Sequence, residues 1–235
     1  METASYQRIR DRLEEYFDRT AVDAWAKLTS DRPVGRIRAT VRAGRDRMRA
    51  TLLSYLPQDL SGQRLLDAGC GTGALAVEAA RRGADVVAID LSPTLVRLAQ
   101  ERMPAQLGAG RIDFRASDML DPALGRFDWV VAMDSVIHYQ AADLAEMVAR
   151  LCARAERGMV FTFAPRTPLL SAMHAVGKVF PAGNRAPAIL PISESTLRQQ
   201  LSQHPLLSAC GIKLGRSERI DSTFYISQAM ELVRP

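Results

Sequence analysis

The segment LLDAGCGTG, residues 65–73, contains the residue types that point most directly to chemistry. Its pattern is a buried strand, then a turn with glycines at alternate positions (Gly69, Gly71 and Gly73), then the start of a helix. Glycines let the backbone turn sharply and approach a ligand, and a helix start offers free N–H groups and the positive end of a dipole. We therefore expect a polar or anionic group to bind here. The spacing Gly69-x-Gly71-x-x-Ala74 also satisfies the looser dinucleotide fingerprint, so the segment alone leaves the ligand open.

Three acidic residues lie at the ends of three successive expected strands. Asp67 precedes the first glycine by two residues, Asp90 ends the run VVAID, and Asp118 follows a third strand in the segment ASDM. At that position the Asp90 carboxylate can accept hydrogen bonds from both hydroxyls of a ribose. Carboxylates at three strand ends suit a cationic, hydroxyl-rich adenosine ligand better than a pyrophosphate.

A histidine and a tyrosine follow the fourth expected strand, residues 127–133. The carboxyl ends of strands in open α/β sheets face the ligand, so His138 and Tyr139 should lie at the site. His138 is better placed there than His174 or His204. A lone histidine is often only a structural hydrogen-bonding group, and this reading stays open. The segment DSVI at 134–137 does not match the DPPY-like run typical of DNA amino-methyltransferases.

Two parallel stripes are expected on a helix that precedes the first strand. One is basic, with steps of four, three and four residues, and consists of Arg38, Arg42, Arg45 and Arg49. The other is apolar and consists of Ile37, Val41, Met48 and Leu52. Such spacing places each set on one helix face. The basic stripe is either a solvated charged face or an anion-binding edge over a ligand site.

The elements that must position these residues alternate along the chain. Strands are expected at 64–68, 85–90, 111–115, 127–133 and 158–163, and helices at 73–82, 94–103 and 141–154. A helix at 194–203 and an antiparallel hairpin of strands 211–220 and 224–232 follow. This alternation predicts an α/β fold with a doubly wound, mostly parallel seven-stranded sheet. Two full domains are not expected in a chain of this length. We expect an N-terminal helical cap over 1–60 on an α/β domain over 61–235, with a proline-rich lid insertion at 165–191.

Composition narrows the class of protein. The 235 residues are 47% hydrophobic and 24% charged, which fits a globular protein with a sizeable core. The net charge of +5 permits an anionic partner without naming one. Cys70, Cys152 and Cys210 are too far apart to indicate a disulfide framework or a metal site, which favours a reducing cytoplasm. We expect neither a secretory signal nor a membrane span, while peripheral membrane attachment stays open.

The set DAGCGTG, AIDLS, ASDM and FDWVVAMDSVIHY resembles the class I S-adenosylmethionine-dependent methyltransferases over about 65–163. The resemblance implies that the three glycines wrap the methionine portion of S-adenosylmethionine. It also implies that Asp90 holds the ribose and that Asp118 and Met119 flank the adenine. The remaining residues expected to bind this cofactor are Asp67, Leu91, Met133 and Arg45.

Further segments are similar to the magnesium-protoporphyrin IX methyltransferases along nearly the whole chain. They are EYF at 15–17 with Trp25, VRAGR at 41–45, IHY at 137–139, FAPRT at 163–167, the lid at 180–187 and FYIS at 224–227. This resemblance implies methylation of one propionate of magnesium protoporphyrin IX in chlorophyll or bacteriochlorophyll biosynthesis. It also implies a cytoplasmic enzyme that could contact the photosynthetic membrane, and a magnesium chelatase subunit that could hand over the porphyrin.

The implied reaction sets the expected roles. A propionate has a pKa of about 4 to 5 and is ionised at neutral pH, so positioning matters more than a strong base. We expect His138 and Tyr16 to orient the propionate as catalytic residues, with Tyr139 supporting the wall. The arginines expected to bind substrate are Arg42, Arg166 and Arg185. The magnesium would belong to the substrate, because the chain shows no pattern of a protein metal site.

Other functions fit parts of the sequence. A different small acceptor, such as a quinone phenol, would need a true base. An RNA or protein methyltransferase would use the basic stripe, although we predict no nucleic-acid partner. A nicotinamide oxidoreductase would use the looser glycine motif, and a non-catalytic cofactor-binding module stays open.

Overall fold

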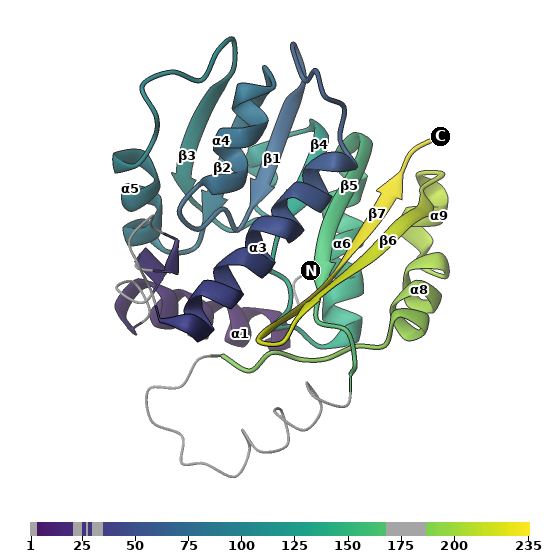
Figure 1. Ribbon diagram of the computed structural model, residues 1–235. Coiled ribbons are helices and arrows are strands. Elements are labelled where there is room, and N and C mark those ends of the chain that lie inside the picture. The colour runs from purple at the N-terminus through teal and green to yellow at the C-terminus, as the bar shows by residue number, and fades with distance from the viewer. Residues whose placement is uncertain (1–3, 21–24, 27, 30–34, 168–186) are drawn as a thin grey trace.

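The computed structural model describes residues 4–20, 25–26, 28–29, 35–167 and 187–235 (Figure 1). Residues 168–186 of the expected lid, with His174 and Arg185, lie outside the described residues.

A seven-stranded sheet forms the centre of the molecule, as the sequence predicts (Figure 1). Its strands are β1 (Arg64–Ala68), β2 (Asp85–Asp90), β3 (Arg111–Ala116), β4 (Phe127–Ala132), β5 (Ala155–Phe163), β6 (Lys213–Ser222) and β7 (Tyr225–Val233). The order is β3-β2-β1-β4-β5-β7-β6. The first five strands are parallel, while β7 runs antiparallel to β5 and β6.

Helices cover both faces of the sheet. One apolar cluster includes residues of α3 (Arg36–Ser54), α4 (Ala74–Arg81) and α5 (Pro93–Glu101). The other includes residues of α1 (Ala4–Glu15), α6 (Ala141–Ala153), α8 (Glu194–Ser202) and α9 (Pro205–Ala209). A π-helical turn, η1 (Tyr16–Thr20), follows α1, and a 3-10 turn, η2 (Pro122–Leu124), precedes β4. Because both faces are covered, β1 and β4 are almost continuously buried.

Helix α3 is part of the core rather than of a separate N-terminal cap. Met48 and Leu52 are fully buried in the same cluster as residues of β1, β2 and β4. Ile37, at the start of the expected apolar stripe, is instead 58% exposed. Residues on both sides of the boundary expected near residue 60 therefore contribute to one apolar cluster.

The order of the strands brings the loops that follow β1, β2 and β4 together at the carboxyl ends of the strands. The chain moves from β1 outward to β2 and β3, then returns to the other side of β1 as β4. Ligands of open α/β sheets bind where the strand order reverses in this way, outside the carboxyl ends of the strands. The loop after β1 is tied to β2, because Gly69 and Cys70 both donate their N–H groups to the Ile89 carbonyl, at 2.9 and 2.8 Å.

The expected hairpin is confirmed, and its tip packs on α3. The turn lies at Thr223, which has a φ of 52°. A Cβ atom on Gly44 of α3 would lie 2.5 Å from the Ser222 Oγ, 2.7 Å from the Tyr225 Cδ1 and 2.9 Å from its Cβ. The absence of a side chain at Gly44 therefore lets α3 approach the hairpin.

We predict that Gly44→Ala destabilises the protein by about 1–3 kcal/mol, because the added methyl group overpacks this contact. Alanine in an unconstrained helix would instead gain about 1 kcal/mol over glycine. Urea unfolding measures the difference. Ala39→Gly at an exposed position of the same helix is the control for helix propensity, and a gain in stability from Gly44→Ala would contradict the packing.

Candidate active site

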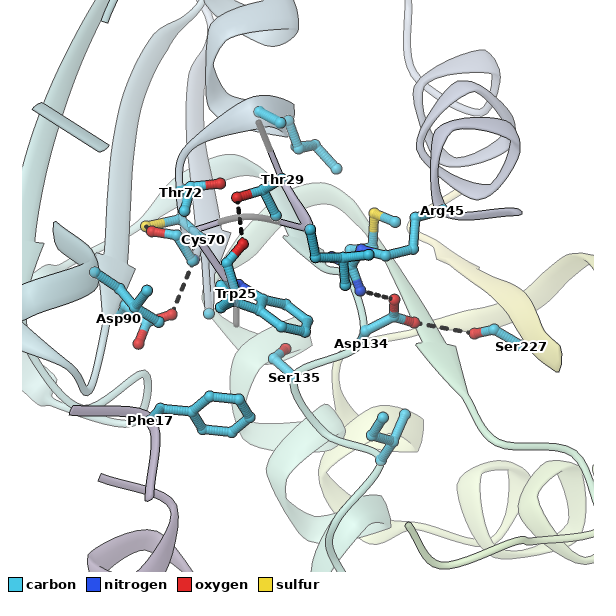
Figure 2. Close-up of a pocket in the computed structure, with 18 of the residues that line it drawn as sticks. Phe17, Trp25, Thr29, Arg45, Cys70, Thr72, Asp90, Asp134, Ser135 and Ser227 are labelled. Atoms are coloured by element: carbon cyan, nitrogen blue, oxygen red, sulfur yellow. Dashed lines mark hydrogen bonds and ion pairs between the residues drawn. The ribbon is translucent and has the colours of Figure 1, made fainter. Parts of the chain in front are cut away.

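A cavity of about 750 Å³ lies at the carboxyl ends of the parallel strands. It is bordered by the loops after β1, β2 and β4, by η1, by α3 and by the β6–β7 turn. Figure 2 shows Arg45, Cys70, Asp90, Asp134 and Ser227 around it. Pockets of this size hold cofactors and drug-sized ligands.

Most predicted site residues line the cavity. They are Tyr16, Arg42, Arg45, Asp67, Gly69, Gly71, Asp90, Leu91, Met119, Met133, His138 and Tyr139. Gly73, Asp118 and Arg166 are not among the lining residues, and Arg185 is outside the described part of the chain.

The glycine loop brings β1 close to the β4 loop. Gly69, with a φ of 84°, leaves room for Ser135, because a Cβ atom there would lie 2.3 Å from the Ser135 Cβ. The Ser135 hydroxyl donates to the Ala68 carbonyl at 2.7 Å. Ser135 therefore joins the carboxyl ends of β1 and β4.

The other two glycines serve different contacts. A Cβ atom on Gly71, which has a φ of 55°, would lie 3.1 Å from the Trp25 Nε1. A Cβ atom on Gly73, at the N-cap of α4, would lie 2.8 Å from the Phe114 ring. Gly73 thus allows close helix–strand packing, and its expected role in wrapping a ligand stays a prediction.

Asp90 is bound to both neighbouring loops. Its Oδ2 accepts the Gly71 N–H at 2.9 Å, and its Oδ1 accepts the Ser92 N–H at 3.0 Å. Burial raises the pKa of Asp90, and these N–H groups oppose the rise. Both oxygens keep lone pairs for hydroxyl donors.

Asp67 is the most unusual carboxylate at the site. It is 1% exposed, and its Oδ2 has no hydrogen-bond partner among the described residues. Burial and the negative charge of Asp90 raise its pKa to about 7, against the opposing effect of the Ala76 N–H. A proton, or a hydrogen-bond donor or cationic group brought by a ligand, would remove the cost of burying this oxygen.

Asp118 is occupied by the N-terminal helix. Its Oδ1 accepts from the Tyr6 hydroxyl at 2.7 Å and from the Leu120 N–H at 2.8 Å. Arg10 donates to its Oδ2 at 3.3 Å. Because these bonds direct the carboxylate toward α1, Asp118 fixes its loop, while the neighbouring Met119 lines the cavity.

Three aromatic side chains are predicted to lie near the reacting groups. Tyr16 begins η1, and His138 and Tyr139 pack against residues of η1 and α1. His138 directs its Nδ1 to the Ala188 carbonyl at 3.2 Å, and burial lowers its pKa below the usual 6.5. Tyr139 is 1% exposed and stacks on Tyr6, with ring centroids 5.3 Å apart. Tyr16 is half-buried against Phe17.

The basic stripe of α3 faces the cavity along its whole length, since Arg38, Arg42, Arg45 and Arg49 all line it. The Nε of Arg42 donates to the Leu28 carbonyl at 2.9 Å. Arg45 forms an ion pair with Asp134 at 2.5 Å and stacks on Trp25 (Figure 2). The stripe is therefore positioned as the edge of a ligand site. Arg166 is exposed and does not line the cavity.

Asp134, Tyr225 and Ser227 line the cavity but were not predicted as site residues. Asp134 has a φ of 54°, and such backbone strain in a residue other than glycine often marks a functional site. The available signals were the acid after the run FDWVVAM and the segment FYIS at 224–227, but nothing in the sequence brings the two together.

Within the described residues, no group of three or more His, Cys, Asp or Glu side chains could hold a metal ion. A helix long and apolar enough to cross a membrane is likewise absent from the part of the chain that the structure describes.

The fold is that of the class I S-adenosylmethionine-dependent methyltransferases, and the sequence profile described as "Methyltransferase domain" matches residues 65–158. The profile "Magnesium-protoporphyrin IX methyltransferase C-terminus" matches residues 132–234. A magnesium-protoporphyrin O-methyltransferase from Rhodobacter capsulatus is 48% identical over 97% of this chain and 98% of its own length. The chain belongs to the magnesium-protoporphyrin O-methyltransferase family.

Two further comparisons differ in how much of the chain they cover. The crystal structure of magnesium protoporphyrin IX methyltransferase from Synechocystis PCC 6803 with bound SAH covers 97% of this chain and 100% of that one, at 28% identity and a TM-score of 0.80. A ubiquinone biosynthesis O-methyltransferase from Xanthomonas oryzae is 38% identical, but over only 51% of this chain and 50% of its own. Similarity to the quinone enzyme is therefore confined to half of the chain.

We predict that Asp67→Asn stabilises the ligand-free protein increasingly as the pH rises from about 4 to about 7. Over this range the folded protein keeps the Asp67 proton, while the unfolded chain loses it at the ordinary aspartate pKa of 3.8. The free energy of unfolding of the wild type therefore falls as the pH rises. Urea unfolding at pH 5 and pH 8 measures this. Asp46→Asn, at a half-exposed side chain on α3, is the matched control. A pH-independent difference between wild type and Asp67→Asn would contradict the burial of an unpaired carboxyl.

Proposed function

We propose that this chain transfers the methyl group of S-adenosylmethionine to a propionate carboxylate of magnesium protoporphyrin IX, giving the monomethyl ester. The observation that carries the proposal is that one cavity contains the buried carboxylate of Asp67, the half-buried carboxylate of Asp90 and, on α3, a line of arginines. Such a cavity suits a cationic cofactor together with an anionic acceptor. The names of the close relatives in the family support the same acceptor.

The acidic part of the cavity fits the cofactor. The unpaired Asp67 Oδ2 would receive the ammonium group of the methionine portion, and Asp90 would receive the ribose hydroxyls. Leu91 and Met119 would flank the adenine, and Arg45 would receive the carboxylate. When bound, the cofactor supplies an electrophilic methyl group on a sulfonium.

The remaining walls fit a large flat acceptor with acidic arms. Arg42 on α3 would bind a propionate, since a guanidinium can donate two parallel hydrogen bonds to a carboxylate. Phe224 and Ile189 line the cavity and are 56% and 42% exposed, so they offer apolar surface to a macrocycle at the entrance. The magnesium would belong to the acceptor. Arg166 and Arg185 stay proposals for contacts outside the described cavity walls.

The tautomer of His138 defines what this residue can do. A carbonyl oxygen only accepts, so the bond to Ala188 places the proton on Nδ1 and leaves Nε2 as an acceptor in the neutral ring. The lowered pKa keeps the ring neutral at physiological pH. His138 therefore cannot donate to an ionised propionate, which differs from the expected orienting role.

We infer a division of roles between His138 and Tyr16. Desolvation in the cavity would raise the pKa of a propionate and the arginines of α3 would lower it, so that a fraction of the acceptor would hold a proton there. The Nε2 of His138 would take this proton, and the Tyr16 hydroxyl would donate to the resulting carboxylate. Exclusion of water and alignment of the oxygen with the methyl group supply the rest of the catalysis.

We predict that kcat/KM falls as the pH drops below 6.5, because protonated His138 can no longer accept a proton. His138→Ala should lower kcat by about a hundredfold and remove this acidic limb of the profile. Tyr16→Phe should lower kcat by about tenfold. His204→Ala, at a histidine paired with Glu146 away from the cavity, is the control. Wild-type kcat and KM in both site variants would show that the roles are wrong.

The function itself is tested by incubating the protein with S-adenosylmethionine and magnesium protoporphyrin IX. Mass spectrometry should show a porphyrin that has gained one methylene unit. A quinone phenol offered in parallel should stay unmodified. Methylation of the phenol alone would favour the alternative acceptor, and modification of neither would reject the proposal.

Two finer proposals come from the sequence resemblance. A magnesium chelatase subunit would hand the porphyrin to the cavity, and the enzyme would work in the cytoplasm with peripheral contact to the photosynthetic membrane. The exposed apolar side chains at the entrance, Phe224 and Ile189, support a route from another surface rather than through water.

A further inference from the structure

Asp134, just beyond β4, collects donors from several separate elements. Its carboxylate accepts from Arg45 of α3 at 2.5 Å, from the Tyr225 hydroxyl at 3.0 and 3.1 Å, and from the Ser227 and Thr162 hydroxyls, each at 3.1 Å. Its own N–H donates to the Thr162 Oγ1 at 2.7 Å. The left-handed backbone and the many donors together fix the carboxylate in one orientation.

This carboxylate determines how Arg45 can meet a ligand. Asp134 takes the Nη1 of Arg45, and the guanidinium stacks 4.7 Å over the Trp25 ring. The Nε and Nη2 of Arg45 have no hydrogen-bond partner in the described part of the chain, and the side chain is 19% exposed in the cavity. These two nitrogens form the parallel fork that matches a carboxylate.

The position of Trp25 places this fork near the glycine loop. The Trp25 indole reaches within 3.1 Å of the point where a Gly71 Cβ would be. Arg45 therefore lies over the part of the cavity in which the proposed function places the amino-acid end of the cofactor.

We propose that Asp134 is a positioning residue, which holds the Nε–Nη2 fork of Arg45 ready for the carboxylate of the cofactor. Tyr225 and Ser227 complete the arrangement by fixing Asp134, which gives the FYIS segment a function. Tyr225 also packs beside Gly44, next to Arg45 on α3, so the hairpin sets both partners of the ion pair. The inference rests on the proposed cofactor and adds the residues that select its carboxylate.

The test compares two ligands of the full chain by isothermal titration. One is S-adenosylhomocysteine, and the other is its decarboxylated analogue, which keeps the amine and lacks the carboxylate. Wild type should bind S-adenosylhomocysteine at least about tenfold more tightly, since hydrogen bonds to charged groups are the strong ones. Asp134→Asn and Arg45→Lys should reduce this preference to about twofold, because the fork is misplaced or lost.

Milder variants protect the test against misfolding. Tyr225→Phe and Ser227→Ala each remove one hydroxyl donor from Asp134 and should reduce the preference partly. Asp67→Asn should weaken both ligands equally, because both carry the amine. Glu78→Gln, which removes a carboxylate paired with Arg81 on α4 away from the cavity, should leave the preference unchanged.

Failure of this inference is distinguishable from failure of the proposed function. If wild type binds neither ligand, the cofactor proposal is rejected. If wild type binds both equally, or if Asp134→Asn keeps the wild-type preference while remaining folded, the positioning role is rejected. If Asp134→Asn or Arg45→Lys binds porphyrin more weakly but keeps the wild-type affinity for S-adenosylhomocysteine, the fork belongs to the acceptor site and the proposal is overturned.

Discussion

The constraint on which the rest of the site depends is a pair of carboxylates at neighbouring strand ends, with that of Asp67 buried and that of Asp90 half-buried. Asp67 and Asp90 lie at the carboxyl ends of β1 and β2, and removing both from water favours their protonated forms. The backbone N–H groups of Gly71 and Ser92 compensate Asp90. Within the described residues nothing compensates the Oδ2 of Asp67. The site therefore holds a cost that a bound cation would remove.

A second charge arrangement crosses the same cavity. The arginines of α3 line the cavity and carry the charge opposite to that of Asp67 and Asp90. Asp134 holds one of these arginines, Arg45, in place. A ligand with an ammonium and a carboxylate can satisfy Asp67 and Arg45 together, whereas a simple anion or cation would satisfy only one. Arg38, Arg42 and Arg49 line the same cavity and would supply the positive charge that faces a second, anionic molecule. This separation of charge explains how one cavity can accommodate a cationic cofactor beside an acidic porphyrin.

Much of the fold follows from local sequence, because the responsible signals are contiguous. The predicted bounds of β1 and β2 match the structure, since each is an apolar run that ends at a turn. Once these two strands are predicted, the positions of the glycine loop, Asp67 and Asp90 at their carboxyl ends can be predicted as well. The five-residue helix α9 was missed because it is too short for a periodic pattern.

The parts that sequence could not supply depend on distant partners. Asp118 is engaged by Tyr6, 112 residues away, and this contact explains why it turns from the cavity. The partners of Asp134 on α3 and β7 are 89 to 93 residues distant. Similarly, Gly73 packs against Phe114, so three glycines that look equivalent in the sequence have three different functions. The tautomer of His138 depends on Ala188, which the sequence does not place nearby.

Proton release on cofactor binding tests the central claim most directly. Isothermal titration with S-adenosylhomocysteine at pH 6.5, in buffers of different ionisation enthalpy, counts the protons exchanged. Free Asp67 has a pKa of about 7 and holds a proton at that pH, and pairing with the ligand's ammonium should expel it. We expect release of most of one proton per site at pH 6.5, falling to none at high pH and absent in Asp67→Asn. Binding without proton release, or with proton uptake, would contradict the account.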